Sequence, residues 1–241
     1  MHLSIVIPAF NEEKLLPVTL AAVNGAAGAL TEKGITHSVI VCDNNSTDRT
    51  AEIARANGAE TIFEAVNHIS RSRNTGATLA TGEWILFLDA DSQPSRELFA
   101  DLAVVLLDES VLFGGCRLVL DEPHGMGNRL IQFWHWLAKK KRWAAGSFFF
   151  VRRSAFEAAG GFSTRLYASE EIDLSIRLGR LAKEQSKRFT FLTAHPLVTS
   201  ARKFRFHSNW WHLRFMLRTL FCGTRNLRRR ESCGLWYDGQ R

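Results

Sequence analysis

Short apolar segments alternate with longer segments of helical pattern over the first 90 residues, and this alternation narrows the choice of architecture more than anything else in the sequence. We expect strands at 3–7, 37–42, 61–63 and 84–88, with helices between them at about 12–34, 46–58 and 72–80. Strands that alternate with helices indicate βαβ units and a parallel sheet. The strand at 84–88 is apolar throughout, which is typical of a sheet that helices cover on both faces.

The second half of the chain predicts the remainder of a single α/β domain. We expect helices at 96–108, 128–140 and 170–184 and strands at 111–120 and 147–151. No internal repeat, low-complexity stretch or flexible linker divides the chain. The sequence therefore predicts one domain over residues 1–200, followed by a basic aromatic segment over 201–241.

The composition excludes several classes of protein. With 46% hydrophobic and 23% charged residues, the chain is neither disordered nor fibrous. Its four cysteines include no Cys-x-x-Cys pair, which argues against a disulfide framework or a cysteine zinc site and fits a reducing compartment. The first residues lack the basic region of a signal peptide, and no apolar stretch is long enough to span a membrane. We therefore expect a cytoplasmic location.

The net charge of +7 belongs to the end of the chain, because residues 202–241 contain ten Lys or Arg and only two acids. Apolar residues are interspersed with arginines there, and the spacing of Trp210, Leu213 and Leu217 predicts one apolar helix face. Two interpretations stay open: a helix packed on the domain with a solvated basic edge, or an interfacial helix on anionic lipid over about 202–230. No motif for reading nucleic acid accompanies the charge, so we expect no nucleic-acid partner.

Polar residues follow the expected strands directly, at the edge where α/β sheets bind their ligands. The sharpest case is Asp89-Ala90-Asp91, which comes immediately after strand 84–88. Two carboxylates one residue apart can hold a hard cation such as Mg²⁺ or Mn²⁺, and that cation can neutralise a diphosphate. The alternative is a solvated turn that caps helix 96–108.

Two further polar loops close the first and second expected strands. The first, Pro8-Ala9-Phe10-Asn11-Glu12, lacks the Gly-x-Gly-x-x-Gly pattern of a dinucleotide site and has the residues of an ordinary turn before a helix. The second, Asp43-Asn44-Asn45-Ser46-Thr47-Asp48, contains residues that commonly cap helices. Beside the first loop, the Asp43 carboxylate can also accept the imide N–H of a uracil ring.

Charged residues begin two of the expected helices. Arg71 and Arg73 stand at a helix N-terminus, where the helix dipole favours anions over cations, so a phosphate contact is the simplest reason for them. Glu170, Glu171 and Asp173 stand in the first turn of another helix. The dipole there holds a carboxylate ionised, as a general base requires, although the same residues also make a good capping turn.

Six motifs in a fixed order make the chain similar to a known family over about residues 3–180. They are Ile5-Val6-Ile7-Pro8-Ala9-Phe10-Asn11-Glu12, Val41-Cys42-Asp43-Asn44-Asn45-Ser46-Thr47-Asp48, Arg73-Asn74-Thr75-Gly76, Leu88-Asp89-Ala90-Asp91-Ser92, Phe150-Val151-Arg152-Arg153-Ser154-Ala155-Phe156 with Gly160-Gly161-Phe162, and Glu170-Glu171-Ile172-Asp173-Leu174. They resemble the motifs of family 2 glycosyltransferases. That family has the GT-A fold of nucleotide-diphospho-sugar transferases.

The resemblance implies a metal-dependent, inverting transfer of a sugar from a nucleotide-sugar, with a UDP-sugar expected, to an acceptor hydroxyl. The acceptor expected with it is a lipid-linked or cell-envelope molecule at the cytoplasmic face of a membrane. By the same resemblance Asp43 and Asn44 hold the base. Asp91 is expected to bind Mg²⁺ or Mn²⁺, with Asp89 beside it and His195 as a candidate third ligand. The remaining nucleotide-sugar contacts are expected at Pro8, Ala9, Asn11, Glu12, Arg71, Arg73, Asn74, Asp89 and Ala90.

The catalytic segment of the family usually reads Glu-Asp-x-Asp-Leu, so its base corresponds to Glu171, while Glu170 and Asp173 stay open as alternatives. A nucleotidyltransferase of the same broad fold would need a Gly-rich phosphate loop after the first strand, where this chain has Pro8-Ala9-Phe10-Asn11. Two other functions are also considered. One is a membrane-associated protein that binds nucleotide-sugars without catalysis. The other is a haloacid-dehalogenase-like phosphohydrolase, because residues 86–92 locally resemble the strand that carries the nucleophile in those enzymes. That chemistry needs its motif on the first strand and a later Gly-Asp-x-x-x-Asp pair, and this chain has neither.

Overall fold

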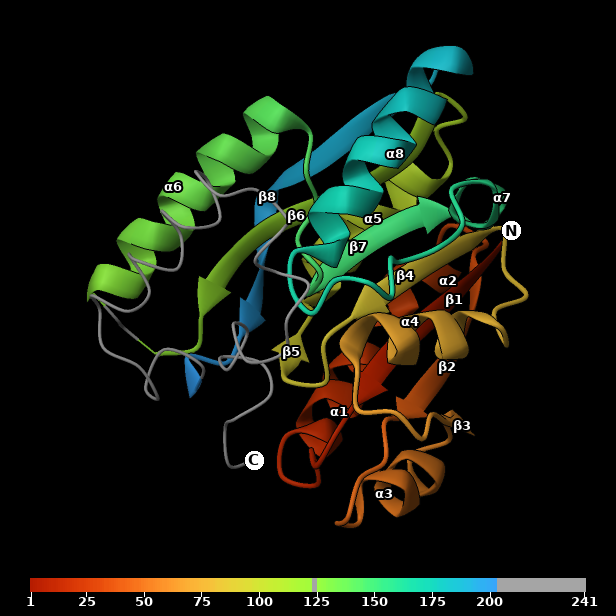
Figure 1. Ribbon diagram of the computed structural model, residues 1–241, viewed down its shortest axis with the longest axis vertical. Helices are drawn as coiled ribbons and strands as arrows, with labels where there is room; N and C mark the ends of the chain where they lie inside the picture. Colours follow the sequence, from red (N-terminus) through yellow and green to blue (C-terminus); the bar gives the residue numbers. More distant parts are fainter. Residues whose placement is uncertain (123–124, 203–241) are drawn as a thin grey trace.

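A computed structural model of the protein describes residues 1–122 and 125–202, and a sheet of eight strands organises them (Figure 1). Across the sheet the strands follow the order β3 (Glu60–Phe63), β2 (Thr36–Asp43), β1 (His2–Ala9), β4 (Trp84–Leu88), β7 (Phe148–Arg152), β6 (Val111–Leu120), β8 (Arg188–Thr199) and β5 (Ser92–Gln93). The first four of these are mutually parallel, and β7 pairs antiparallel with both β4 and β6. The sheet is thus mostly parallel on its N-terminal side and mixed on the other.

The helices lie on both faces of this sheet (Figure 1). In chain order they are α1 (Leu16–Ala26), α2 (Gly28–Thr31), α3 (Thr50–Ala56), α4 (Ile69–Ala77), α5 (Arg96–Leu106), α6 (Gly125–Lys141), α7 (Arg153–Ala158) and α8 (Glu170–Glu184). Helices α1 and α5 pack together on one face, whereas α4 packs on β1 and β2, and α8 packs near β6 and β8. In residues 1–122 and 125–202, no helix is long and apolar enough to cross a membrane.

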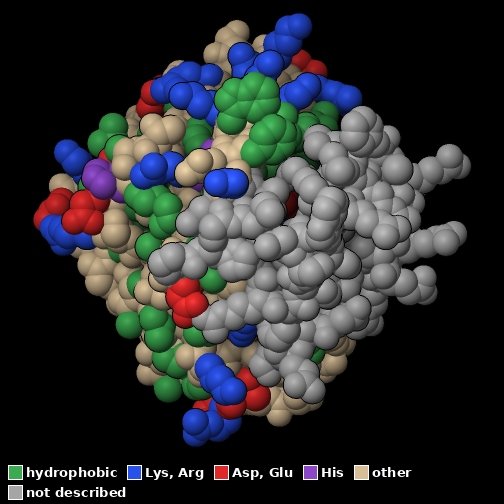
Figure 2. Space-filling view, turned by 90° about the vertical axis from the view of Figure 1, so that its left-hand side faces the viewer, with side chains coloured by type: hydrophobic (Ala, Val, Ile, Leu, Met, Phe, Trp, Pro, Cys, Tyr) green, Lys and Arg blue, Asp and Glu red, His purple; other side chains and the backbone are tan. Residues whose placement is uncertain are grey.

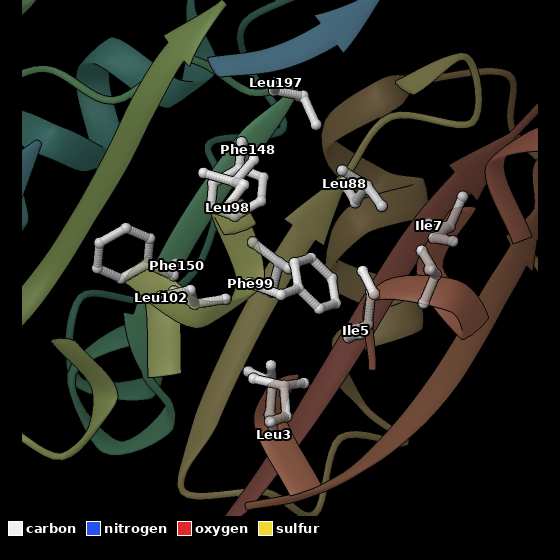
Figure 3. Close-up of a cluster of buried hydrophobic side chains, with 14 of the residues drawn as sticks. Leu3, Ile5, Ile7, Leu88, Leu98, Phe99, Leu102, Phe148, Phe150 and Leu197 are labelled. Carbon is white, nitrogen blue, oxygen red and sulfur yellow. The ribbon is translucent and has the colours of Figure 1, made fainter. Parts of the chain in front are cut away.

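Two apolar clusters, one on each face, hold the helices to the sheet. Side chains of β1 alternate between them, so that Ile5 and Ile7 belong to one cluster and Val6 to the other. Strand β4 alternates in the same way, with Leu86 on the side of Ile5 and Phe87 on the opposite side. Figure 3 shows part of the first cluster, where side chains of β1, β4, β7 and α5 meet. The expectation of a sheet covered on both faces is confirmed.

The expected elements agree with the structure except in four places. The helix expected at 46–58 is shorter, since α3 begins at Thr50 with Arg49 as its N-cap residue and ends at Ala56. The predicted helix over 12–34 begins only at Leu16, because the loop continues to Leu15 and Pro17 lies in the first turn of α1, and it is divided at Ala27 into α1 and α2. The helix expected at 72–80 begins earlier, at Ile69, after the extended residue His68. The long strand β8 and the short elements α7 and β5 were not predicted. The basic aromatic segment over 201–241 lies almost entirely outside the described residues.

Candidate active site

The loops after β1 and β2 form one layer at the carboxyl edge of the sheet. Ala9 and Asp43 are register partners at the ends of these strands, and the backbone N–H of Asn44 donates to the carbonyl of Ala9 at 2.8 Å. The Asn11 side-chain oxygen accepts from the N–H of Thr47 at 2.8 Å, and the N–H of Asn11 donates to the hydroxyl of Ser46 at 3.0 Å. The structure therefore brings together the two loops that the sequence assigned to a nucleotide.

Asp43 and Asn44, both buried, have different roles in this layer. An oxygen of the Asp43 carboxylate accepts from the backbone N–H of Ser46 at 3.1 Å, which holds the carboxylate at the rim of the loop. The Asn44 amide donates to the carbonyls of Glu64 and Val66 and accepts from the N–H of His68 at 3.0 Å. Asn44 thus shapes the wall after β3, whereas the Asp43 carboxylate stays beside the loop that follows β2.

Glu12 follows Pro8, Ala9 and Asn11 in the first loop. Its buried carboxylate pairs with Arg202, an arginine at the C-terminal end of the described residues. Arg202 Nη2 lies 2.8 Å from Glu12 Oε1 and 3.1 Å from Glu12 Oε2. The same nitrogen lies 3.8 Å from Asp91 Oδ2. The segment after β8 therefore adds positive charge between the first loop and the acidic motif, a contact that no motif of the sequence signalled.

The Asp89-Ala90-Asp91 motif lies at the carboxyl end of β4, as the sequence predicted. Asp89 Oδ1 accepts from Arg73 at 3.0 Å, and Asp89 Oδ2 accepts from the hydroxyl of Ser147 at 3.1 Å. The carbonyl of Ala90 accepts from Thr19 at 2.7 Å. The Asp91 side chain is 4% exposed. Asp89 is therefore fixed by a neighbouring cation, and Asp91 lies near Arg202, which pairs with Glu12 of the first loop.

Arg71 and Arg73, both expected to contact phosphate, lie in different surroundings. Arg71, with a side chain 45% exposed, pairs with Glu64 at 3.1 Å. Arg73 is buried and bridges Asp89, at 3.0 Å, and Glu170, at 2.5 Å. The bridge joins the end of β4 to the start of α8, so it connects the acidic motif with the predicted base segment.

The three acids at the start of α8 differ in what they contact. Glu170 is engaged by Arg73, and Asp173 pairs with Arg177 at 2.7 Å. Glu171 is half-buried, and its carboxyl group lies within the electrostatic influence of both Glu170 and Arg73. Burial, together with the negative charge of Glu170, raises the pKa of Glu171 to about 8, against the opposing effect of Arg73. A carboxyl group with such a pKa can take up and release a proton near neutral pH.

Two polar side chains position the segment before α8. The Asn74 amide, expected to bind the nucleotide-sugar, donates to the carbonyl of Phe162 at 2.8 Å and accepts from its N–H at 2.9 Å. Arg177 donates to the carbonyl of Gly161 at 2.8 Å and to that of Ala159 while it pairs with Asp173. Asn74 holds the chain that leads into α8 directly, and Asp173 does so through Arg177. The role of Arg177 was not predicted.

A divalent cation fits this site only as part of a complex with phosphate. Within residues 1–122 and 125–202, no three His, Cys, Asp or Glu side chains are grouped so that they could hold a metal ion. His195, the candidate third ligand, lies on β8 and pairs instead with Asp101 of α5, its Nδ1 being 3.0 Å from Oδ2. Mg²⁺ is usually held by one or two carboxylates together with substrate phosphates. Asp91, with Asp89 near it, suits that kind of site.

The comparisons with known proteins agree with the geometry. The family described as Glycosyl transferase family 2 matches residues 4–160, which is more than half of the chain. An uncharacterized glycosyltransferase of Mycobacterium bovis is 35% identical over 136 residues, which make up 56% of this chain and 54% of that protein. The probable glycosyltransferase YdaM of Bacillus subtilis is 27% identical over 74% of this chain and 46% of its own length. The chain thus spans about half the length of these relatives.

Solved structures share the fold at low sequence identity. The crystal structure of S. aureus TarS 1-349 in complex with UDP-GlcNAc has a TM-score of 0.64 at 16% identity and covers 99% of this chain and 71% of that chain. The glucosyl-3-phosphoglycerate synthase of Mycobacterium tuberculosis in complex with Mn²⁺ and UDP-glucose has a TM-score of 0.60 at 16% identity and covers 90% of this chain and 78% of that chain. The expected GT-A fold is confirmed, and the phosphohydrolase alternative finds no support.

Proposed function

The chain belongs to glycosyl transferase family 2, and on that premise we propose that it transfers a sugar from a UDP-sugar to an acceptor hydroxyl with inversion at the anomeric carbon. The single observation that supports the proposal most is the Arg73 bridge. It connects Asp89, beside the proposed metal ligand Asp91, with the segment that contains Glu171. One buried cation, Arg73, thereby links the acidic motif that would hold the metal and the departing diphosphate to the helix start whose Glu171 would take up the acceptor proton.

The proposed donor site is the layer formed by the loops after β1 and β2. Asp43 would accept the imide N–H of the uracil ring, and the backbone from Pro8 to Glu12 would line the nucleotide. Asn44 and Asn11 would act by holding the loops in place, because their amide groups are engaged with the neighbouring backbone. Two donors found with the structural neighbours, UDP-GlcNAc and UDP-glucose, are the ones to test first.

The proposed chemistry separates charge neutralisation from proton transfer. Asp91, with Asp89 beside it, would hold Mg²⁺ or Mn²⁺, which when bound supplies positive charge to the leaving diphosphate. Glu171 would take the proton from the acceptor hydroxyl as that oxygen attacks the anomeric carbon, and the diphosphate would leave from the opposite face. Glu170 would keep Arg73 in place rather than act as the base. The acceptor we propose is a lipid-linked or envelope molecule at the cytoplasmic face of a membrane.

Calorimetric titration with UDP, GDP, ADP and CMP, each with and without Mn²⁺, tests the donor assignment. We expect UDP to bind most tightly and its affinity to rise with Mn²⁺, and we expect the Asp91→Asn variant to lose the effect of the metal. Asp101→Asn is the matched control, because that acid pairs with His195 on the surface of α5. Equal, metal-independent binding of all four nucleotides would contradict the proposal. Tight UDP-sugar binding without release of UDP, in the presence of extracted lipid-linked acceptors, would favour a protein that binds nucleotide-sugars without catalysis.

A further inference from the structure

Helix α6 exposes two aromatic side chains on one face. Phe133 is 41% and Trp136 57% exposed, and their rings stack with centroids 5.9 Å apart. Lys140 Nζ lies 5.0 Å from the centre of the Trp136 ring. Since these residues are three and four positions apart, they form one stripe along the helix. The side of the molecule that contains α6 in Figure 1 faces the viewer in Figure 2, where hydrophobic side chains gather among Lys and Arg side chains.

The opposite face of α6 is fixed to the domain, so the aromatic stripe cannot turn inward. Ala138 is fully buried, and Ile131 packs against the first apolar cluster. The His135 ring accepts the backbone N–H of Leu118, in β6, at 2.9 Å. Burial lowers the pKa of His135 to about 4, so the ring is a neutral acceptor at neutral pH. The side chains that point away from the sheet are therefore held outward by defined contacts on the other side.

The exposed face is also strongly cationic. Arg129, Lys139, Lys140, Lys141 and Arg142 are all exposed, and residues 125–142 contain no Asp or Glu. None of the five forms an ion pair with a carboxylate of the described residues. Aromatic rings beside flexible lysines are the composition of a helix that lies in a membrane interface, with rings at the level of the headgroups and ammonium groups among anionic phosphates.

We propose that α6 docks on an anionic lipid surface. Charge disfavours two alternatives within the protein itself. The basic segment after residue 201, with ten Lys or Arg against two acids over 202–241, would be repelled by the cationic face. A second copy of the protein would bring two identical cationic faces together. An anionic bilayer instead complements the charge and accepts the aromatic rings.

This contact would place the lipid surface next to the candidate active site. Only residues 142–146 separate the end of α6 from Ser147, whose hydroxyl donates to Asp89 at 3.1 Å. Gly146 packs so closely on Arg73 that a Cβ there would lie 2.5 Å from the guanidinium. A docked α6 would therefore hold the acceptor side of the site near the membrane, a consequence that rests on the proposed function, whereas the docking itself does not.

Vesicle flotation with the full chain tests the docking, using phosphatidylcholine vesicles with and without phosphatidylglycerol. We expect binding only to the anionic vesicles. The double variant Phe133→Ser, Trp136→Ser should bind at least about tenfold more weakly, since two aromatic rings no longer enter the interface. Phe63→Ser is the matched control, because Phe63 is 58% exposed on β3, at the other edge of the sheet. A triple Gln variant of Lys139, Lys140 and Lys141 should also bind more weakly.

Wild-type affinity in the aromatic double variant, or an equal loss in Phe63→Ser, would overturn the proposal. Equal binding to both kinds of vesicle would overturn the anionic preference. A dimer that sedimentation velocity detects in the wild type and not in the double variant, without vesicle binding, would assign the face to a second copy instead. Titration of each variant with UDP separates the two proposals: unchanged UDP affinity shows intact folding, and absent UDP binding in the wild type would contradict the proposed donor without affecting the flotation result.

Discussion

At the scale of single residues, the buried cation Arg73 is the group on which the site depends most. It is 3% exposed and pairs with Asp89 and Glu170 at once. Replacing it by Met keeps the volume but removes the cation that pairs with the buried carboxylate of Glu170 and the partly buried carboxylate of Asp89, so we expect Arg73→Met to lower the free energy of unfolding by about 3–5 kcal/mol. Arg71→Met is the control, and because Arg71 is half exposed its change should stay within about 1 kcal/mol. Urea unfolding of both variants measures the difference, and equal losses would contradict it.

The raised pKa of Glu171 predicts a pH dependence. Burial and the charge of Glu170 raise this pKa to about 8, so the carboxyl group is mostly protonated at pH 7 and becomes a competent base as the pH rises. We expect kcat/KM to increase through about pH 8 and then level off. Glu171→Gln should lose this step together with about 10²–10⁴-fold of kcat, while the affinity for UDP stays unchanged.

Asp173→Asn is the matched control for that experiment. Asp173 pairs with Arg177, and through it with the turn at Gly161, so its loss should lower stability and leave the step near pH 8 in place. If Asp173→Asn removed the pH step and Glu171→Gln kept it, the base would be Asp173. Fixed-time assays of UDP release between about pH 6 and 10, a range that brackets the raised pKa of Glu171, distinguish the two outcomes.

Among the residues of the site, the sequence identified the polar positions but not what each one contacts. Asp89, Asp91 and Glu171 were predictable because each follows a strand or begins a helix, where α/β proteins place functional groups. The burial of Arg73 was not, because its two partners lie 16 and 97 residues away. The surface position of His195 was likewise invisible, since its partner Asp101 belongs to a helix 94 residues earlier.

At the scale of elements, β1 to β4 were predictable and β8 was not. β1, β2 and β4 have apolar centres and end in polar loops, and β3 is a short segment next to them. β8 begins with Arg188, contains Pro196, and pairs with β6 through a shift of register, so that Cys116 faces Leu192 but Leu118 faces Leu197. A proline usually excludes a central strand, and here the irregularity accommodates it. The information that makes residues 188–199 a strand lies in β6 and β5, not in the segment itself.

Two glycines of neighbouring elements give opposite predictions for the same substitution. Gly179 lies inside α8 with nothing within 4 Å of an added Cβ, so Gly179→Ala should stabilise the protein by about 0.5–1 kcal/mol. Gly160 also has open space, but its φ of +76° lies in the left-handed region, so Gly160→Ala should destabilise by a comparable amount. Chemical unfolding of the two variants measures both signs. A gain at Gly160 would mean that backbone strain does not decide the effect there.

At the scale of the whole molecule, ligand binding should couple distant parts of the chain. Arg202, near the end of the described residues, contacts Glu12 at 2.8 Å and lies 3.8 Å from Asp91. The site thus joins the first loop, the end of β4 and the segment after β8, and a ligand there binds only the folded state. A nucleotide at 100 times its Kd is expected to stabilise the fold by about 2.7 kcal/mol.

If a metal ion bridges Asp91 and the diphosphate, UDP and Mn²⁺ together should stabilise the protein by more than the sum of their separate effects, because each raises the affinity for the other. Asp91→Asn should remove this excess and retain the effect of UDP alone, since the proposed contacts with the base lie on the loops after β1 and β2. Thermal unfolding with UDP, Mn²⁺ or both measures the excess. Additive effects in the wild type would mean that the metal and the nucleotide bind independently, and the proposed role of Asp91 would then be wrong.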